Sequence, residues 1–273
     1  MSSLLVVLLV LPLVASALSL LGRIRLSEAA TLGSGLACFV LTVALALSVR
    51  HGEERHALNN WLHLDSLGAV FLLATGLLYG AGAVFSIGYL RAGGDRAGFR
   101  SYARRYYVFL NLFGWTMLLV PLMNDYATLW VGIELTTIVS VLLVAVDRTD
   151  AALEAAWKYV LIASVGLGIA LLGVIVLYAA GIGALGDSYL PRFDSYLAVS
   201  SRLSAVPVEF AFLLAVVGFG TMVGFAPLHT WLPDAHSEAP SPVSALLSGA
   251  LLANAFYAIL RFYQVTVAAG GGD

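Results

Sequence analysis

The chain has 273 residues, of which 60% are hydrophobic and 11% are charged, and its formal net charge is -2 at pH 7. A soluble domain carries about 25% charged residues, so the composition excludes an ordinary soluble protein, and the net charge argues against a nucleic-acid partner. The single cysteine, Cys38, excludes an intramolecular disulfide and a cysteine metal cage.

Apolar runs of about 20 residues, each long enough to cross the hydrocarbon core of a bilayer, recur along the sequence. We predict eight membrane-spanning helices, over residues 2–22, 28–49, 64–90, 106–123, 125–146, 152–181, 206–232 and 241–263. We expect the first to be a retained helix and not a cleaved signal peptide, because no basic residue precedes it and its apolar run is longer than a signal core. The predicted fold class is all-α and polytopic, since backbone exposed to lipid must satisfy its own hydrogen bonds.

Arginines near the predicted helix ends indicate the orientation. One side has Arg23, Arg25, Arg91, Arg96, Arg100, Arg104, Arg105 and Arg148, and the other has Arg50, Arg55, Arg192, Arg202 and Arg261. The positive-inside rule places the side with more arginines in the cytoplasm. We therefore predict a protein of the cell's inner (plasma) membrane with both termini outside the cytoplasm, Arg96 inside, and residues 187–202 outside.

Glu134 lies about nine residues into its predicted helix, close to the bilayer midplane. A charged acid there costs roughly 2.5–3.5 kcal/mol on insertion scales, so such residues face a protein interior and commonly serve a function. A moving charge nearby can move the proton of such a group, which favours a role in proton transfer. The alternative is a permanently protonated carboxyl group hydrogen-bonded to a backbone carbonyl, Thr136 or Thr137.

Lys158 is the only lysine in the chain and lies inside the sixth predicted helix. Unlike arginine, lysine can lose its proton when desolvated, which suits a proton relay. Two alternatives stay open, namely extension of the side chain to the membrane interface and an ion pair with Glu154 one helical turn away.

The stretch from Gly218 to His236 begins like a membrane helix and then meets two prolines. Pro227 and Pro233 cannot donate backbone hydrogen bonds, so we predict that the seventh helix is broken there, as membrane helices are where they line a cavity. Polar side chains crowd the break: His229, Asp234, His236 and Glu238. Their spacing is not specific for a metal, so we predict no metal site. His229 is the strongest functional candidate among them, and the others suit a polar interfacial loop.

No other motif carries chemistry. The chain has no Walker loop, and Gly166-Val-Gly168 lies in an apolar run with no strand before it, so no dinucleotide site is indicated. We expect no cofactor in this chain.

Three stretches resemble the antiporter-like subunits of respiratory complex I and its relatives. They are Trp130-Val-Gly-Ile-Glu134, Glu154-Ala-Ala-Trp-Lys158-Tyr, and the long motif from Pro227 to Leu247. Within that superfamily the chain is similar to hydrogenase-4 component F or to NADH dehydrogenase subunit 5-like proteins. The resemblance runs from about residue 64 to the end.

The resemblance implies roles for single residues. Glu134 matches the family's glutamate on the fifth helix, Lys158 its lysine on the sixth, and His229 falls in the broken segment, so these three are the predicted proton carriers. Met222 stands where the family has the lysine of the seventh helix that pairs with the glutamate, so the switch position lacks its charge. Secondary channel candidates are Ser248, where some relatives have a histidine, with Asp234 and His236.

The resemblance also implies a domain organisation. Residues 1–105 hold helices one to three, and residues 106–264 form a five-helix repeat, helices four to eight, which is the first of the family's two inverted repeats. The second repeat is absent, because the chain stops after eight predicted helices where the family has about fourteen. A fragment, a split gene and a shortened subunit stay open.

The resemblance implies a membrane subunit of a proton-translocating oxidoreductase, of the NADH:quinone or hydrogenase-4 type, with no redox centre or catalytic site of its own. The implied partners are other membrane subunits of a respiratory or hydrogenase complex, a separate chain carrying the second repeat, and the lipid bilayer. Two alternatives are a cation/proton antiporter module and a truncated scaffold that transports nothing. Met222 and the missing repeat favour the scaffold.

Overall fold

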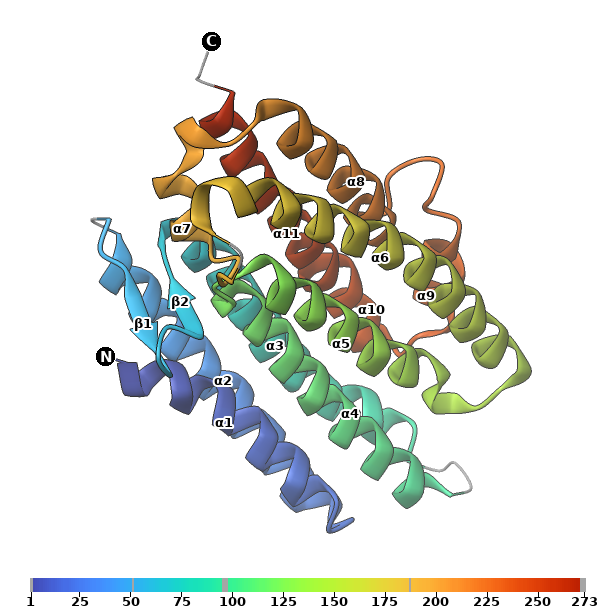
Figure 1. Ribbon diagram of the computed structural model, residues 1–273. Coiled ribbons are helices and arrows are strands. Elements are labelled where there is room, and N and C mark those ends of the chain that lie inside the picture. The colour runs from blue at the N-terminus through green and yellow to red at the C-terminus, as the bar shows by residue number, and fades with distance from the viewer. Residues whose placement is uncertain (1, 51, 95–97, 187, 271–273) are drawn as a thin grey trace.

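The computed structural model describes residues 2–50, 52–94, 98–186 and 188–270. The chain forms a bundle of long helices lying side by side between two ends (Figure 1). The helices are α1 (Ser2–Ser19), α2 (Ile24–Val49), α3 (Ser66–Ala92), α4 (Phe99–Leu119), α5 (Tyr126–Val144), α6 (Asp150–Leu185), α7 (Phe193–Ala198), α8 (Ala205–Val223), α9 (Trp231–Glu238), α10 (Ser241–Leu246) and α11 (Leu252–Ala269). A π-helical segment, Leu247–Leu251, joins α10 to α11, and the strands are β1 (Arg55–Ala57) and β2 (Leu62–Leu64).

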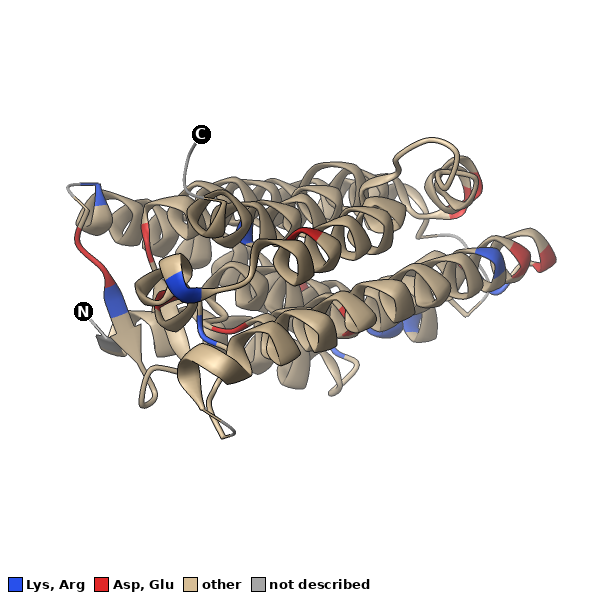
Figure 2. Cartoon of the chain, turned by 45° about the horizontal axis from the view of Figure 1, so that its top comes forward, with Lys and Arg blue, Asp and Glu red and all other residues tan. Residues whose placement is uncertain are grey.

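Six of the helical segments described are long and apolar enough to cross a membrane, which makes the chain a multi-pass membrane protein: α2, α3, α5, α6, α8 and the continuous α10–α11. Helices α1 and α4 run beside them between the same two ends (Figure 1). The all-α polytopic fold class is confirmed, and the count of eight spans stays a prediction. Figure 2 shows the charged residues mostly toward the two ends of the bundle, with long uncharged helix between them.

We call the end that holds β1 and β2 the hairpin end, and the end that holds residues 224–240 the break end. Helix α1 begins and α11 ends at the hairpin end (Figure 1). Arg96 and Asp187, which entered the orientation prediction, lie outside the described residues.

Short polar side chains fix where three of the long helices begin. Asp65 accepts a hydrogen bond of 2.8 Å from the backbone N of Gly68 at the start of α3, and Asp125 caps α5 in the same way. Thr149 accepts a bond of 3.1 Å from Ala152 at the start of α6. Each cap satisfies a backbone donor that the first helical turn leaves free.

Several predicted helix edges differ from the structure, those of α4 and α6 among them. Helix α4 begins at Phe99 and not at residue 106, so the predicted domain boundary at residue 105 lies inside it. Its first two turns are rich in arginine, which hid them from an apolar-run search although arginine is a good helix former. Helix α6 extends over 36 residues, beyond both ends of the predicted 152–181.

A β-hairpin that the sequence did not predict covers the hairpin end. Strands β1 and β2 pair antiparallel, with His56 opposite His63. The turn holds Leu58, Asn59 and Asn60 at positive φ, a conformation that asparagine tolerates better than most residues. The amide of Asn124 donates 2.8 Å to the carbonyl of Asn60 and fastens the turn to the start of α5.

A buried ion pair joins the last helix to the start of α3. Arg261 donates to both carboxylate oxygens of Asp65, at 2.6 and 2.7 Å, and its side chain is 2% exposed. Its Nε donates 2.9 Å to the Tyr257 hydroxyl, and its guanidinium lies 4.6 Å from the centre of the Phe193 ring. This cluster connects α3, α7 and α11 at the hairpin end.

We expect Asp65→Asn to lower the free energy of unfolding by about 3–5 kcal/mol, because it leaves the Arg261 guanidinium buried without its counter-charge. Thermal unfolding of the purified chain in detergent measures the change. The exposed Arg202 provides the control, and Arg202→Gln should stay within about 0.5 kcal/mol of the wild type. A loss no larger than that of the control would contradict the assigned role of the pair.

The pair also predicts a pH dependence of stability. Burial opposes ionisation of Asp65, but the hydrogen bonds and charge of Arg261 outweigh it and hold the pKa of Asp65 below its ordinary value. The contribution is therefore fully present above the unfolded-state pKa, about 3.9, and is lost as the pH falls through the folded-state pKa. Below about pH 4, the melting temperature of the wild type should fall more steeply than that of Asp65→Asn.

Candidate functional site

The helix predicted over residues 206–232 is broken, as predicted, although it ends earlier than residue 232. Helix α8 stops at Val223, where Gly224 takes a left-handed conformation with φ 85°. Residues 225–230 are exposed and not helical, and α9 begins at Trp231. Gly224 ends the helix without the strain a side chain would meet at positive φ, and Pro227 prevents it from resuming.

Trp231 holds the broken segment against the bundle. Its indole N–H donates 2.9 Å to the carbonyl of Thr221 in the last turn of α8, and its ring stacks on Tyr159 of α6 with centroids 4.3 Å apart. The Tyr159 hydroxyl is 2.9 Å from the Ser140 hydroxyl on α5. The sequence did not predict these contacts among Trp231, Tyr159 and Ser140, although Tyr159 directly follows Lys158 and Ser140 lies on the same helix as Glu134.

Glu134 is the ninth of the 19 residues of α5 and is half-buried, close to the middle of its helix as predicted. Within the described part of the chain its carboxylate has no hydrogen bond and no ion pair. The hydroxyls of Thr136 and Thr137 donate to the backbone carbonyls of Gly132 and Ile133, at 2.7 and 3.0 Å. The threonines therefore serve the helix backbone and leave the carboxylate free.

Met222 is fully buried in the last turn of α8. Its sulfur lies 3.8 Å from the hydroxyl oxygen of Thr137, which is three residues beyond Glu134 on α5. The position that the resemblance assigns to a lysine thus faces the helix that carries the glutamate. An uncharged thioether packs there, and it can supply only a weak acceptor.

Lys158 is paired with two acids at the break end. Its Nζ lies 2.8 Å from Glu154 one turn earlier on α6, and 3.0 Å from Asp234 on α9. The pair with Glu154 is therefore present, and Asp234 adds a contact that sequence spacing could not indicate. The three side chains line a cavity of about 170 Å³.

The remaining predicted residues are not gathered into one site. His229 is exposed on the loop after α8, and Ser248 is exposed on the π-helical segment. His236 is half-buried, and its Nε2 has no hydrogen bond to any described residue. Burial lowers the pKa of His236 below its ordinary value, because it disfavours the charged imidazole.

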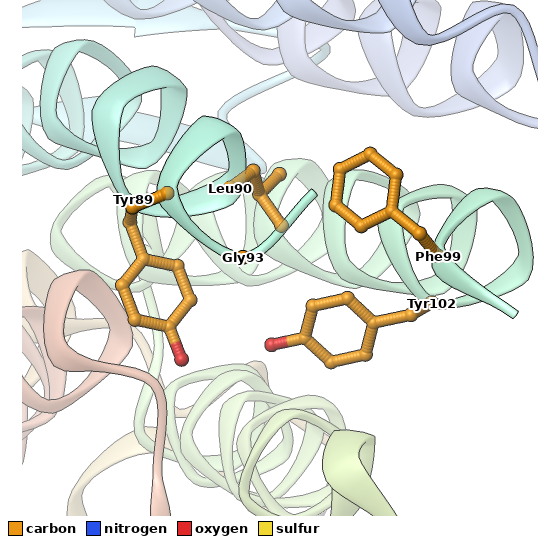
Figure 3. Close-up of a pocket in the computed structure, with 6 residues that line it drawn as sticks. Tyr89, Leu90, Gly93, Phe99 and Tyr102 are labelled. Atoms are coloured by element: carbon orange, nitrogen blue, oxygen red, sulfur yellow. The ribbon is translucent and has the colours of Figure 1, made fainter. Parts of the chain in front are cut away.

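A separate pocket of about 200 Å³ lies at the break end, between the end of α3 and the start of α4. The hydroxyls of Tyr89 and Tyr102 point toward the same space between these helices (Figure 3). No predicted site residue lines this pocket, so it is distinct from the cavity at Lys158.

Residues 123–271 match the family described as NADH:quinone oxidoreductase/Mrp antiporter, TM. The chain is similar to a hydrogenase-4 component F homolog from Methylacidiphilum infernorum, with 36% identity over 203 residues, which are 73% of this chain and 42% of that protein. It is also similar to NADH-quinone oxidoreductase subunit N from Thioalkalivibrio sulfidiphilus, with 31% identity over 213 residues, which are 77% of this chain and 41% of that protein.

A solved structure of the membrane-bound sulfane sulfur reductase, described as an archaeal respiratory membrane complex, contains a chain of the same fold. The TM-score is 0.79 at 20% identity, and the match covers 96% of this chain and 53% of that one. The chain thus spans less than half of the two relatives' length and about half of the structural neighbour. Because the family match covers more than half of the 273 residues, the chain belongs to the NADH:quinone oxidoreductase/Mrp antiporter transmembrane family.

Proposed function

We propose that the chain is a membrane subunit of a proton-translocating oxidoreductase of the NADH:quinone or hydrogenase-4 type. The names of the two relatives support this assignment. The observation that carries it within the molecule is a carboxylate, Glu134, in the middle of a membrane helix with no partner among the described residues. An intramembrane ionisable group of this kind is costly unless it has a function.

The proposed proton path enters at the break end. The cavity at Lys158 is open to solvent and lined by acids, so it can collect a proton from water. Tyr159 and Ser140 follow, and their hydroxyls are 2.9 Å apart and able both to donate and to accept. Glu134 lies within electrostatic reach of Tyr159, and it would receive the proton near the middle of the membrane.

His229 has a different role in the proposal from the buried groups. It is exposed on the loop that the break creates, where it would exchange protons with water before they reach the cavity. Asp234 would act with Lys158, and His236 and Ser248 stay secondary channel candidates.

Met222 favours a second candidate, a scaffold that transports nothing. A buried thioether stands where a cation would pair with Glu134, so the switch between the two helices has no charge on one side. A cation/proton antiporter module is the third candidate, since the family description includes Mrp antiporters.

The proposal includes other membrane subunits as partners, among them a chain that carries a second repeat. It places the chain in the plasma membrane with the break end in the cytoplasm, because most arginines of the described chain lie there. Seven are at the break end: Arg23, Arg25, Arg91, Arg100, Arg104, Arg105 and Arg148.

Glu134→Gln keeps the size and hydrogen bonding of the side chain but cannot exchange a proton. We expect proton translocation by the assembled complex to fall at least about tenfold, as followed with a pH-sensitive dye in membrane vesicles, while immunoblots show normal insertion. Glu209, which is exposed on α8, provides a matched control, and Glu209→Gln should pump normally. Normal pumping by Glu134→Gln would support the scaffold.

Met222→Lys tests whether position 222 communicates with Glu134. We expect the new cation to be tolerated better beside the native Glu134 than in the Glu134→Gln background, with a coupling free energy of about 1–3 kcal/mol in a double-mutant cycle of thermal unfolding. Met222→Leu is the control and should cost less than about 1.5 kcal/mol. Additive effects of Met222→Lys and Glu134→Gln would mean that the two positions do not interact.

Single cysteines test the proposed orientation. The native Cys38 is buried, whereas Gly94 at the break end and Ser201 at the hairpin end are exposed. An impermeant thiol reagent on intact cells should label the Ser201→Cys variant and leave Gly94→Cys unlabelled until the membrane is permeabilised. The opposite pattern would reverse the orientation.

A further inference from the structure

Three potential metal ligands meet on the β-hairpin, at the opposite end of the bundle from the break. Glu54 directly precedes β1, His56 lies on β1, and His63 lies opposite it on β2. One ligand atom from each lies within 4.8 Å of the other two. The sequence predicted no metal site anywhere in the chain, and that prediction was argued only from the polar residues of the break.

The spacing of these atoms fits the ligands of one metal ion with tetrahedral coordination. Glu54 Oε2 lies 3.4 Å from His56 Nε2 and 3.3 Å from His63 Nε2. Ligands about 2.0–2.1 Å from a zinc ion, at tetrahedral angles, are themselves about 3.3–3.4 Å apart. The two imidazole rings stack with centroids 4.9 Å apart, and each Nε2 lies within 3.4 Å of the same carboxylate oxygen.

His63 provides an independent observation. It is 4% exposed, and neither of its ring nitrogens has a hydrogen bond to any described residue. The 3.3 Å approach of Glu54 to Nε2 therefore lacks hydrogen-bond geometry. Two ligands of one ion approach each other in this off-axis way, because each donor points toward the ion and not toward the other ligand. A buried nitrogen without a partner is costly, and an ion at Nε2 would remove that cost.

The chemistry of the ligand set selects the class of ion. Two imidazoles and one carboxylate suit Zn²⁺ and similar divalent transition metals, whereas Ca²⁺ and Mg²⁺ prefer oxygen ligands throughout. The Glu54 side chain is 52% exposed, so water can reach the fourth position. We infer that Glu54, His56 and His63 form a binding site for Zn²⁺, with water as the fourth ligand.

The ion would join the two strands of a hairpin whose strands have only three residues each. Asn124 and the pairing of Leu62 with Met123 fasten the same hairpin to the start of α5. The site would therefore fix the hairpin against the bundle, independently of the proton path at the other end.

Zinc binding to the whole chain, purified in detergent without a polyhistidine tag, tests the site. Isothermal titration with Zn²⁺ should show one ion per chain. Glu54→Gln, His56→Gln and His63→Gln should each weaken binding at least tenfold to a hundredfold, since loss of even outer-shell partners has effects of this size. Zn²⁺ should also raise the melting temperature of the wild type in a concentration-dependent way.

Glu53 and His229 provide matched controls, because both are exposed and neither belongs to the group. Glu53→Gln and His229→Gln should bind Zn²⁺ as the wild type does. His63 is buried, so if His63→Gln does not fold, the more accessible Glu54→Gln and His56→Gln decide the question. Absence of saturable binding by the wild type, or equal affinity in the Glu54→Gln/His56→Gln double variant, would overturn the site.

Discussion

The bidentate pair between Arg261 and Asp65 organises one end of the molecule. A guanidinium that is 2% exposed must have its charge and its donors satisfied by the protein. Asp65 does this while capping α3, so one carboxylate both begins a membrane helix and holds the last helix in place. Tyr126, at the start of α5, adds a hydrogen bond of 2.9 Å to the Arg261 carbonyl. Four elements that are distant in sequence thus meet at one residue, Arg261, and β2 ends directly before Asp65.

At the other end of the bundle, the break end, a helix is interrupted. There α8 ends early, and Gly224 and Pro227 leave an exposed loop where the helix would otherwise continue. Trp231 limits the disruption, since its indole satisfies a carbonyl of the last turn of α8 and its ring covers Tyr159. The break can therefore open a polar entrance beside Lys158 without loosening the packing of α6 and α8. The interrupted end suits the proposed entry of protons beside Lys158, and the ion pair at the opposite end anchors the helices.

The features that sequence predicts are those that depend on neighbouring residues. Hydropathy placed Glu134 in the middle of a helix, and Pro227 predicted the break. Both are local signals, because each can be recognised within a single helical turn or membrane span. The contact between Lys158 and Asp234 spans 76 residues, and that between Arg261 and Asp65 spans 196, so no local pattern marks either. Arg261 was counted only as a charge at a helix end, although it is among the most buried polar side chains. His56 and His63 escaped notice because strands of three residues are too short to show an alternating pattern.

The proposed path crosses part of the membrane potential, and the size of that part depends on where Lys158 lies along α6. The 36 residues of α6 extend about 54 Å, well beyond the roughly 30 Å of hydrocarbon. With the midpoint of each helix at the bilayer centre, Lys158 lies about 14 Å from the midplane and Glu134 within about 2 Å of it. A proton that passes between them crosses somewhat less than half of the insulating layer. Since a full crossing is worth about 2.3 kcal/mol per 100 mV, this outward step from the cytoplasm would cost about 1 kcal/mol against a potential of about 100 mV that is negative inside.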